Sequence, residues 1–295
     1  MKNNLLKKGW GILLNTIIGI CMVVALLFLL QLFCYTSFKI PTDSMTPTLL
    51  VGDRILVNKM TLGARLFDVV AALKGEQVRI RRMPALGHLE RNDVIVFNFP
   101  YGKSRWDSVR MDVTQYYVKR CVALPGDTLE IKDGSYQVRG YAGPLGNPHS
   151  EQIISSLTED DAKRSGISTR TYPFSERLGW DIWNFGPLPV PKAGQVVRMD
   201  SVTYLLYRPL IAWEQRRKLC LADGAVLLGD SVIAQYRFLK NYYFVSGDQA
   251  LNSQDSRYWG LLPEEYIVGK VVRVWYSEDK WSGEARWNRW MKRVE

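Results

Sequence analysis

Residues 11–35 read GILLNTIIGICMVVALLFLLQLFCY, a run that contains no charged side chain. As an α-helix this run is roughly 37 Å long, which is enough to cross a hydrocarbon core of about 30 Å with some tilt. Lys2, Lys7 and Lys8 precede it, so the positive-inside rule predicts a cytoplasmic N-terminus. We therefore expect three parts: a cytoplasmic tail at 1–10, a transmembrane anchor at 11–35 and an extracytoplasmic domain at 36–295.

Two other interpretations of this apolar run fit the sequence less well. A cleaved signal peptide has an apolar region of about 7–15 residues that ends in a small-x-small site. Here the run is longer, and the residues that follow it, 33–38, supply no such site. A buried core helix also fits less well, because no polar face interrupts the run. Beyond the membrane, Cys121 and Cys220 would meet an oxidising compartment, and the sequence leaves open whether they pair.

Composition restricts the chemistry that the chain can perform. It has 295 residues, 47% of them hydrophobic and 23% charged, which is typical of a folded protein. Its two histidines, His88 and His149, are too few for a multi-histidine metal site, and its four cysteines include no C-x-x-C pair. We therefore expect no metal and no cofactor. The net charge of +10 fits phospholipid headgroups better than nucleic acid, because the chain carries an anchor.

The part after the anchor is expected to be mainly β, an antiparallel sheet domain with an inserted β subdomain. Gly, Pro, Asn and Asp clusters separate short apolar or alternating runs. The runs predicted to be strands are Arg54–Asn58, Val94–Asn98, Tyr116–Leu124, Thr128–Ile131, Val196–Met199, Tyr242–Val245 and Ile267–Tyr276. Helices are predicted at Glu159–Arg164 and Ile211–Leu219. The expected division is a core at about 36–138 and 240–278, an insert at 139–239 and a tail at 279–295.

Three short motifs carry the polar residues of interest. Ser44 follows the anchor in PTDSMTPTL, Lys119 lies in the apolar strand YYVKRCVALPGD, and the third motif, GDQALNSQDSRYWG, starts at Gly247. Each has a plain structural interpretation by itself. Ser44 would cap a turn, Lys119 would extend from an edge strand to water, and the third motif would be a polar turn.

Taken together and in this order behind one anchor, the motifs resemble those of type I signal peptidases, the membrane-anchored Ser/Lys proteases of bacterial export. The stretches that carry the resemblance are SMTPTL (44–49), GDRILVNK (52–59), RNDVIVF (91–97), KRCVALPGD (119–127) and GDQALNSQDSR (247–257). In the last stretch Gln249, Ala250 and Leu251 replace the Asn, Arg and Asp that are usual in the family. A charged pair is lost there, which leaves the rigidity of that loop open.

The resemblance implies a catalytic dyad in which Ser44 is the nucleophile and Lys119 the general base. With no credible histidine, a lysine must serve, and burial can lower its pKa far enough for it to accept a proton. The resemblance assigns the oxyanion hole to the Ser44 N–H and the Thr42 hydroxyl, and the orientation of the lysine amine to Ser253. The residues expected to hold the last loop against the lysine strand are Asp255, Arg257 and Arg120.

The substrate implied by the resemblance is the signal peptide of an exported preprotein, with small residues at positions −1 and −3. Shallow apolar pockets would exclude larger side chains. The residues expected to bind substrate are Phe38, Ile40, Met45, Leu49, Ile55, Val96, Tyr117 and Val118. We expect a monomer, single-pass in the bacterial inner membrane, with its N-terminus in the cytoplasm, its catalytic domain on the periplasmic side, and phospholipid beside it.

Two alternatives belong to other classes. One is a catalytically degenerate, membrane-tethered periplasmic binding or scaffold protein, which would explain the anchor and the strands but not the Ser/Lys motifs. The other is a self-cleaving Ser/Lys repressor, which requires a DNA-binding domain where this chain has a membrane span.

The C-terminal tail has its own pattern. Trp287, Trp290, Met291 and Val294 recur at helical spacing among basic residues. Indole rings and cations both favour the lipid headgroup region, so an interfacial helix over residues 283–294 is one interpretation. A tail that packs on the β domain is the other.

Overall fold

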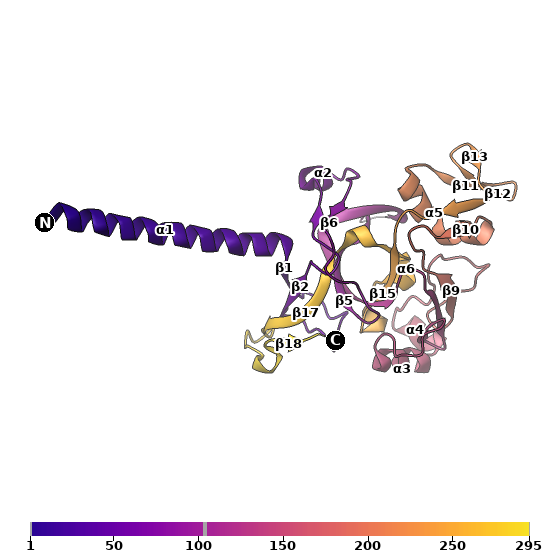
Figure 1. The fold of residues 1–295 in the computed structure, drawn as a ribbon. Coiled ribbons are helices and arrows are strands. Elements are labelled where there is room, and N and C mark those ends of the chain that lie inside the picture. Colours follow the sequence, from indigo (N-terminus) through magenta and orange to yellow (C-terminus); the bar gives the residue numbers. More distant parts are fainter. Residues whose placement is uncertain (1, 103–104, 295) are drawn as a thin grey trace.

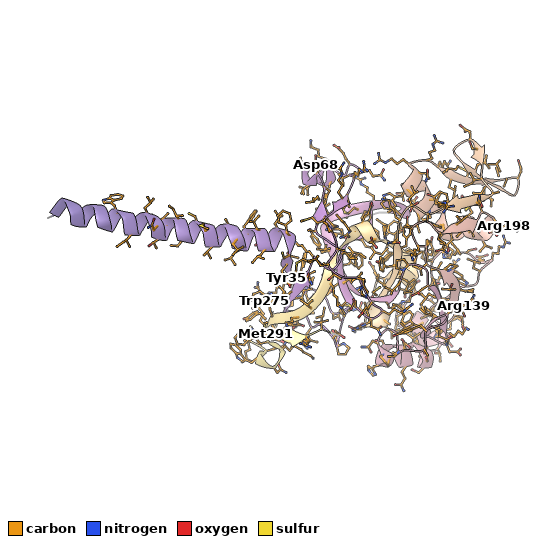
Figure 2. All side chains as sticks on the ribbon, viewed as in Figure 1. Tyr35, Asp68, Arg139, Arg198, Trp275 and Met291 are labelled. Carbon is orange, nitrogen blue, oxygen red and sulfur yellow. The ribbon has the colours of Figure 1, made fainter. Side chains whose placement is uncertain are left out.

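The computed structural model describes residues 2–102 and 105–294, and it consists of one long helix and a β-rich body (Figure 1). Helix α1 (Lys2–Phe33) projects from the body as a rod, and its segment Trp10–Phe33 is long and apolar enough to cross a membrane. Side chains point outward from this segment on all sides and none of it is buried, which excludes a soluble core helix (Figure 2). The helix ends slightly before the expected boundary, because Tyr35 already belongs to the first strand.

The body is built on one large antiparallel sheet. In their side-by-side order its strands are β1 (Tyr35–Lys39), β2 (Asp53–Asn58), β17 (Ile267–Ser277), β5 (Val94–Gly102), β6 (Arg105–Ala123), β15 (Tyr242–Ser246) and β16 (Leu262–Pro263). Strand β18 (Lys292–Arg293) pairs with β17 outside this path. Segments from the two ends of the chain thus meet in one sheet.

Side-chain patterning explains these strands. Every residue of β5 but the last is buried, in keeping with its continuous apolar sequence, whereas β2 alternates between buried and half-buried positions because its other face is nearer solvent. The predicted strands correspond to β2, β5, β6, β7 (Thr128–Lys132), β10 (Val196–Arg198), β15 and β17. The mainly β, antiparallel fold class expected from the sequence is confirmed.

The region predicted as an insert contains helices as well as strands. A three-stranded sheet joins β7, β8 (Ser135–Val138) and β9 (Phe185–Pro189), so it spans the expected boundary at residue 139. Besides β10, the remaining elements of the insert are α3 (Pro148–Ser156), α4 (Glu159–Arg164), α5 (Ser201–Gln215), β11 (Leu219–Ala222), β12 (Ala225–Leu228), β13 (Ser231–Val232) and β14 (Gln235–Arg237). This region lies on the far side of the body from α1 (Figure 1).

One of the two helix predictions is correct and one is misplaced. Helix α4 has the predicted bounds. The helix predicted at 211–219 is α5, which begins earlier because the Asp200 side chain accepts hydrogen bonds from the N–H groups of Val202 and Thr203. It ends where Arg216 adopts a left-handed conformation, and the last predicted residue belongs to β11.

Short elements connect the large ones. Between β2 and β5, a small hairpin of β3 (Arg65–Leu66) and β4 (Arg81–Arg82) flanks α2 (Val69–Leu73). After β15 the chain forms η1 (Ala250–Asn252), α6 (Ser256–Trp259) and η2 (Glu264–Tyr266). The segment from Gly247 to Arg257, called here the last loop, therefore consists largely of single turns.

The C-terminal tail packs on the sheet and is not an interfacial helix. Residues Trp287–Arg289 form one 3₁₀ turn (η3), and the next residues form β18 on the edge of β17. Arg289 is buried and its guanidinium pairs with the Asp53 carboxylate at the start of β2, with Nε 2.9 Å from Oδ1. Trp287 and Trp290 remain 70% and 59% exposed. Sheet pairing and a buried ion pair override the local helical spacing.

We expect Arg289→Ala to lower the free energy of unfolding by about 3–5 kcal/mol, because it leaves a carboxylate of 0% exposure at Asp53 without its cation. Chemical denaturation of the full chain in detergent, followed by tryptophan fluorescence, measures the change. Arg293→Ala, at an exposed position of β18, is the control and should shift stability little. Equal stability of the two variants would contradict the structural role of the Arg289–Asp53 pair.

Candidate active site

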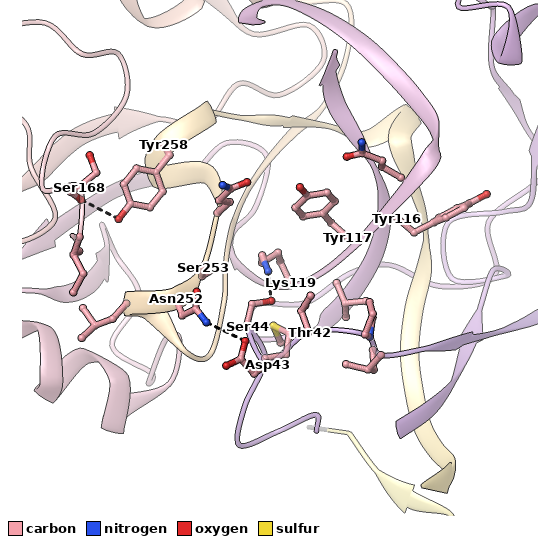
Figure 3. A pocket seen from close by; sticks show the side chains of 18 of the residues that line it. Thr42, Asp43, Ser44, Tyr116, Tyr117, Lys119, Ser168, Asn252, Ser253 and Tyr258 are labelled. Atoms are coloured by element: carbon pink, nitrogen blue, oxygen red, sulfur yellow. Dashed lines mark hydrogen bonds between the residues drawn. The ribbon is translucent and has the colours of Figure 1, made fainter. Parts of the chain in front are cut away.

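The structure brings together the serine and the lysine that the motifs singled out. Ser44 lies in the turn that follows β1, and Lys119 lies on β6, 75 positions further along the chain. Lys119 Nζ is 2.6 Å from Ser44 Oγ (Figure 3). A nucleophile and a base within hydrogen-bond reach are what acyl transfer requires.

Burial sets the charge state of the lysine. Lys119 is only 2% exposed, and this desolvation lowers the pKa of its amine to about 8. Asp255 and Asp248 oppose this shift and Arg257 reinforces it. The amine therefore spends part of its time neutral near physiological pH, when it can accept a proton.

Asp255 organises the last loop. Its carboxylate accepts hydrogen bonds from the Ser253 hydroxyl at 2.8 Å, the Gly247 N–H at 3.0 Å and Arg257 Nε at 2.9 Å. Burial by itself would raise the pKa of Asp255, but Arg257 and these hydrogen bonds hold it below the usual value. The Ser253 hydroxyl donates its hydrogen bond to Asp255. The expectation that Ser253 orients the Lys119 amine therefore stays a prediction.

A second buried ion pair connects the lysine strand to the last loop. Arg120 Nε and Nη2 donate to the two carboxylate oxygens of Asp248 at 2.7 and 2.6 Å. From the sequence, Asp255 and Arg257 were expected to hold the last loop against β6 together with Arg120, and Asp248 was not singled out. Asp255 does pair with Arg257, but inside the last loop, and Asp248 is the residue that joins the loop to β6. Its signal in the sequence is the Gly-Asp pair that opens the third motif.

The last loop also contacts the turn that carries Ser44. The Gln249 N–H donates to the Ser44 carbonyl at 3.0 Å, and Asn252 Nδ2 donates to Asp43 Oδ1 at 3.0 Å. With its amide turned to donate, Gln249 also bonds the Asp43 carbonyl at 2.8 Å. A Cβ at Gly247 would lie 2.6 Å from the Ser44 carbonyl oxygen, so glycine is required for this approach.

Two of the three departures from the family pattern, Ala250 and Leu251, are explained by the insert. Ala250 and Leu251 pack with Ile154 of α3 and with Ile182, so an apolar contact replaces the usual charged pair. The Arg257 guanidinium donates to the Ala250 carbonyl at 2.6 Å. The loop whose rigidity the sequence left open is thus held by the insert on one side and by Arg257 on the other.

A cavity of about 990 Å³ surrounds the dyad. Thr42, Ile40, Met45, Tyr117 and Val118 line it, as expected, together with Ser44, Lys119 and Ser253. Phe38 lies beside it, with its ring centroid 4.9 Å from that of Tyr116. The other predicted substrate-binding residues are Leu49, Ile55 and Val96. They are fully buried in the hydrophobic core next to the cavity, so they support its wall but do not line it.

The two cysteines of the body, Cys121 and Cys220, do not line the cavity. Cys121 is buried in β6 and Cys220 is half-buried in β11, and both are free thiols. In residues 2–102 and 105–294, no group of three His, Cys, Asp or Glu side chains is close enough to hold a metal ion.

Comparison with known proteins identifies the family. The model of the family described as "Signal peptidase, peptidase S26" matches residues 13–199 and 217–276. The matched residues are most of the chain and include all three motifs. The chain therefore belongs to the signal peptidase family, peptidase S26, and is a peptidase.

Two relatives from other bacteria agree with this assignment. The chain is 28% identical to a Signal peptidase I of Aquifex aeolicus, over 87% of this chain and 81% of the relative. It is 28% identical to a Signal peptidase I of Pseudomonas aeruginosa, over 86% of this chain and 69% of the relative. A crystal structure of a signal peptidase I from Enterococcus faecalis is 18% identical and covers 62% of this chain and 95% of its own, with a TM-score of 0.29.

We expect Lys119→Met to stabilise the fold at neutral pH, by up to about 3 kcal/mol, because it removes a buried amine whose folded pKa is about 8 against an ordinary 10.5. The wild type gains stability as pH rises from 8 to 10.5, so the advantage of the variant should shrink over that range. Thermal unfolding of the full chain in detergent at pH 6 and pH 10 measures it. Lys192→Met, at an exposed position, should show no such trend. A Lys119→Met chain less stable at both pH values would contradict the desolvation cost.

Proposed function

We propose that this chain is a membrane-bound serine endopeptidase that removes N-terminal signal peptides from exported preproteins, with Ser44 as nucleophile and Lys119 as general base. The observation that carries the proposal is the 2.6 Å contact between Lys119 Nζ and Ser44 Oγ, with the lysine buried and its pKa lowered, in a member of the signal peptidase family.

The proposed mechanism follows acyl transfer. Neutral Lys119 takes the proton of the Ser44 hydroxyl as Oγ attacks the scissile carbonyl, and the resulting ammonium returns it to the leaving amine. The developing oxyanion would be held by the Ser44 N–H and the Thr42 hydroxyl, for which no hydrogen-bond acceptor is present in the described part of the chain. Each such donor contributes about 3 kcal/mol in comparable sites.

Substrate would bind by strand addition. Strand β1 pairs on one side only, and the stretch 114–118 of β6 pairs with β5 but not with β15. Residues 40–42 and 114–118 both line the cavity, so an extended peptide fits between these two free backbone edges. Its small side chains at −1 and −3 would face Ile40, Met45, Tyr117 and Val118.

The anchor supports a membrane location. Helix α1 ends at Phe33 and leads directly into β1, which places Ser44 a short distance along the chain from the expected membrane surface. The apolar segment of a signal peptide occupies the same membrane. We propose that the protein is a monomer that crosses the bacterial inner membrane once. Residues 1–10 would lie in the cytoplasm, and the catalytic domain would lie outside, beside phospholipid. We propose no role in binding nucleic acid.

The catalytic roles are tested with detergent-solubilised full chain and a preprotein that has Ala at −1 and −3. Ser44→Ala and Lys119→Arg should each reduce cleavage by more than 10³-fold, because guanidinium stays protonated and cannot act as a base. For the wild type, log kcat/KM should rise with pH up to about 8 and then level off, since only the neutral amine is active. An active Lys119→Arg enzyme with a flat profile would refute the general-base role and favour a binding or scaffold protein.

Specificity provides a separate test of the pocket. Replacing Ala by Phe at −1 of the preprotein should lower kcat/KM at least 100-fold, because Met45 is buried and the cavity floor cannot retreat to admit a ring. The matched control is the same replacement at −2, which should have a small effect because alternate side chains of a strand face away from the floor. Comparable losses at −1 and −2 would argue against strand addition in this register.

A further inference from the structure

The cavity extends past the dyad to a wall that the substrate-binding prediction did not include. Ile167 and Ser168 of the insert line it there, together with Leu251 and Tyr258. In Figure 3, Ser168 and Tyr258 lie on the opposite side of Ser44 from Tyr116. The catalytic serine thus lies between two walls, one made by β1 and β6 and the other by the insert and the last loop.

This second wall is firmly built. The Tyr258 hydroxyl donates to the Ser168 carbonyl at 3.2 Å, and the Ile167 N–H donates to the Ala162 carbonyl at the end of α4 at 2.9 Å. Ile167, Leu251 and Tyr258 pack as partly buried side chains around one small apolar cluster. An apolar surface of this kind is already in place before a ligand arrives.

The two walls would bind different parts of the substrate, because its apolar segment enters from the membrane side. The apolar segment of a signal peptide lies in the membrane, and α1 enters the body at β1 (Figure 1). Residues before the scissile bond therefore occupy the side of β1 and β6. Residues after it must leave past Ser44, and the insert wall lies on that side.

Charge adds a selective element. The half-buried Asp43 lines the same cavity, and within the described residues its carboxylate accepts hydrogen bonds from two neutral amides, those of Asn252 and, once turned to donate, Gln249. No cation forms an ion pair with it among these residues, so its negative charge is available to act on a ligand. An acidic side chain that approached this wall would meet a like charge and an apolar surface together.

We propose that Ile167, Leu251 and Tyr258 form a subsite for the first residues of the mature chain, one that accepts apolar side chains and disfavours acidic ones. The inference rests on the proposed function and deepens it: the insert selects substrates on the far side of the scissile bond. Because alternate side chains of an extended peptide face the same way, the preference should appear at every second position after the cut.

The test uses the full chain in detergent and preproteins identical up to −1, with Leu or Asp placed in turn at +1 to +4. The wild type should cleave the Leu substrate about tenfold faster, in kcat/KM, at the two alternate positions whose side chains face the wall. Ile167→Ser should reduce that ratio to about 2 or less. Val232→Ser, an exposed valine on β13 outside the cavity, is the matched control and should keep the wild-type ratio. Comparing two substrates within one enzyme cancels any general loss of activity.

Equal rates for Leu and Asp at all four positions in the wild type would overturn the subsite, and so would an unchanged ratio in Ile167→Ser. The wild-type ratio is informative even if that variant fails to fold. Asp43→Asn provides an independent measure, since it should raise the relative rate of the Asp substrate whatever its effect on overall activity. A wild type that cleaves neither substrate would instead refute the proposed function.

Discussion

A buried amine beside a serine hydroxyl is the interaction on which the rest of this structure depends. Lysine is normally protonated at neutral pH, and Lys119 can act as a base only while the protein keeps it out of water. Burial of a charged form costs free energy, which the surrounding sheet must offset. The long strand β6, paired with β5 along its length, holds the lysine in place by backbone hydrogen bonds that do not depend on its charge.

Two buried ion pairs position the last loop, one by joining it to this strand and one from within. Arg120 and Asp248 connect β6 to the loop, and Asp255 and Arg257 order the loop internally. Pairs of this kind contribute little net stability, because desolvation costs nearly as much as the attraction returns. These two ion pairs act on geometry. Their bidentate contacts fix the positions of Ser253 and of the backbone around Gly247 relative to Ser44. The arrangement also places a carboxylate near Lys119 that limits how far its pKa falls.

The insert is part of the site and not an appendage to it. It packs on Ala250 and Leu251, where the family usually has a charged pair, and it supplies Ile167 and Ser168 to the cavity. An apolar contact tolerates small shifts better than an ion pair, but it requires a partner surface. The last loop of this chain is therefore supported by an apolar contact with the insert in place of the charged pair that is usual in the family.

The sequence by itself determined the apolar span, the alternation of most strands and the Ser44 and Lys119 motifs, because each is encoded in neighbouring residues. It could not determine which charge pairs with which: Asp248 rather than Asp255 meets Arg120, since only the register of β15 on β6 brings them together. Nor could it separate cavity wall from core at Leu49, Ile55 and Val96, which share the apolar character of residues that do line the cavity. The tail shows the same limit, because its helical spacing yields to pairing with β17 and to the contact between Arg289 and Asp53. Long-range contacts decided these points, and they arise only when segments distant in the chain are packed together.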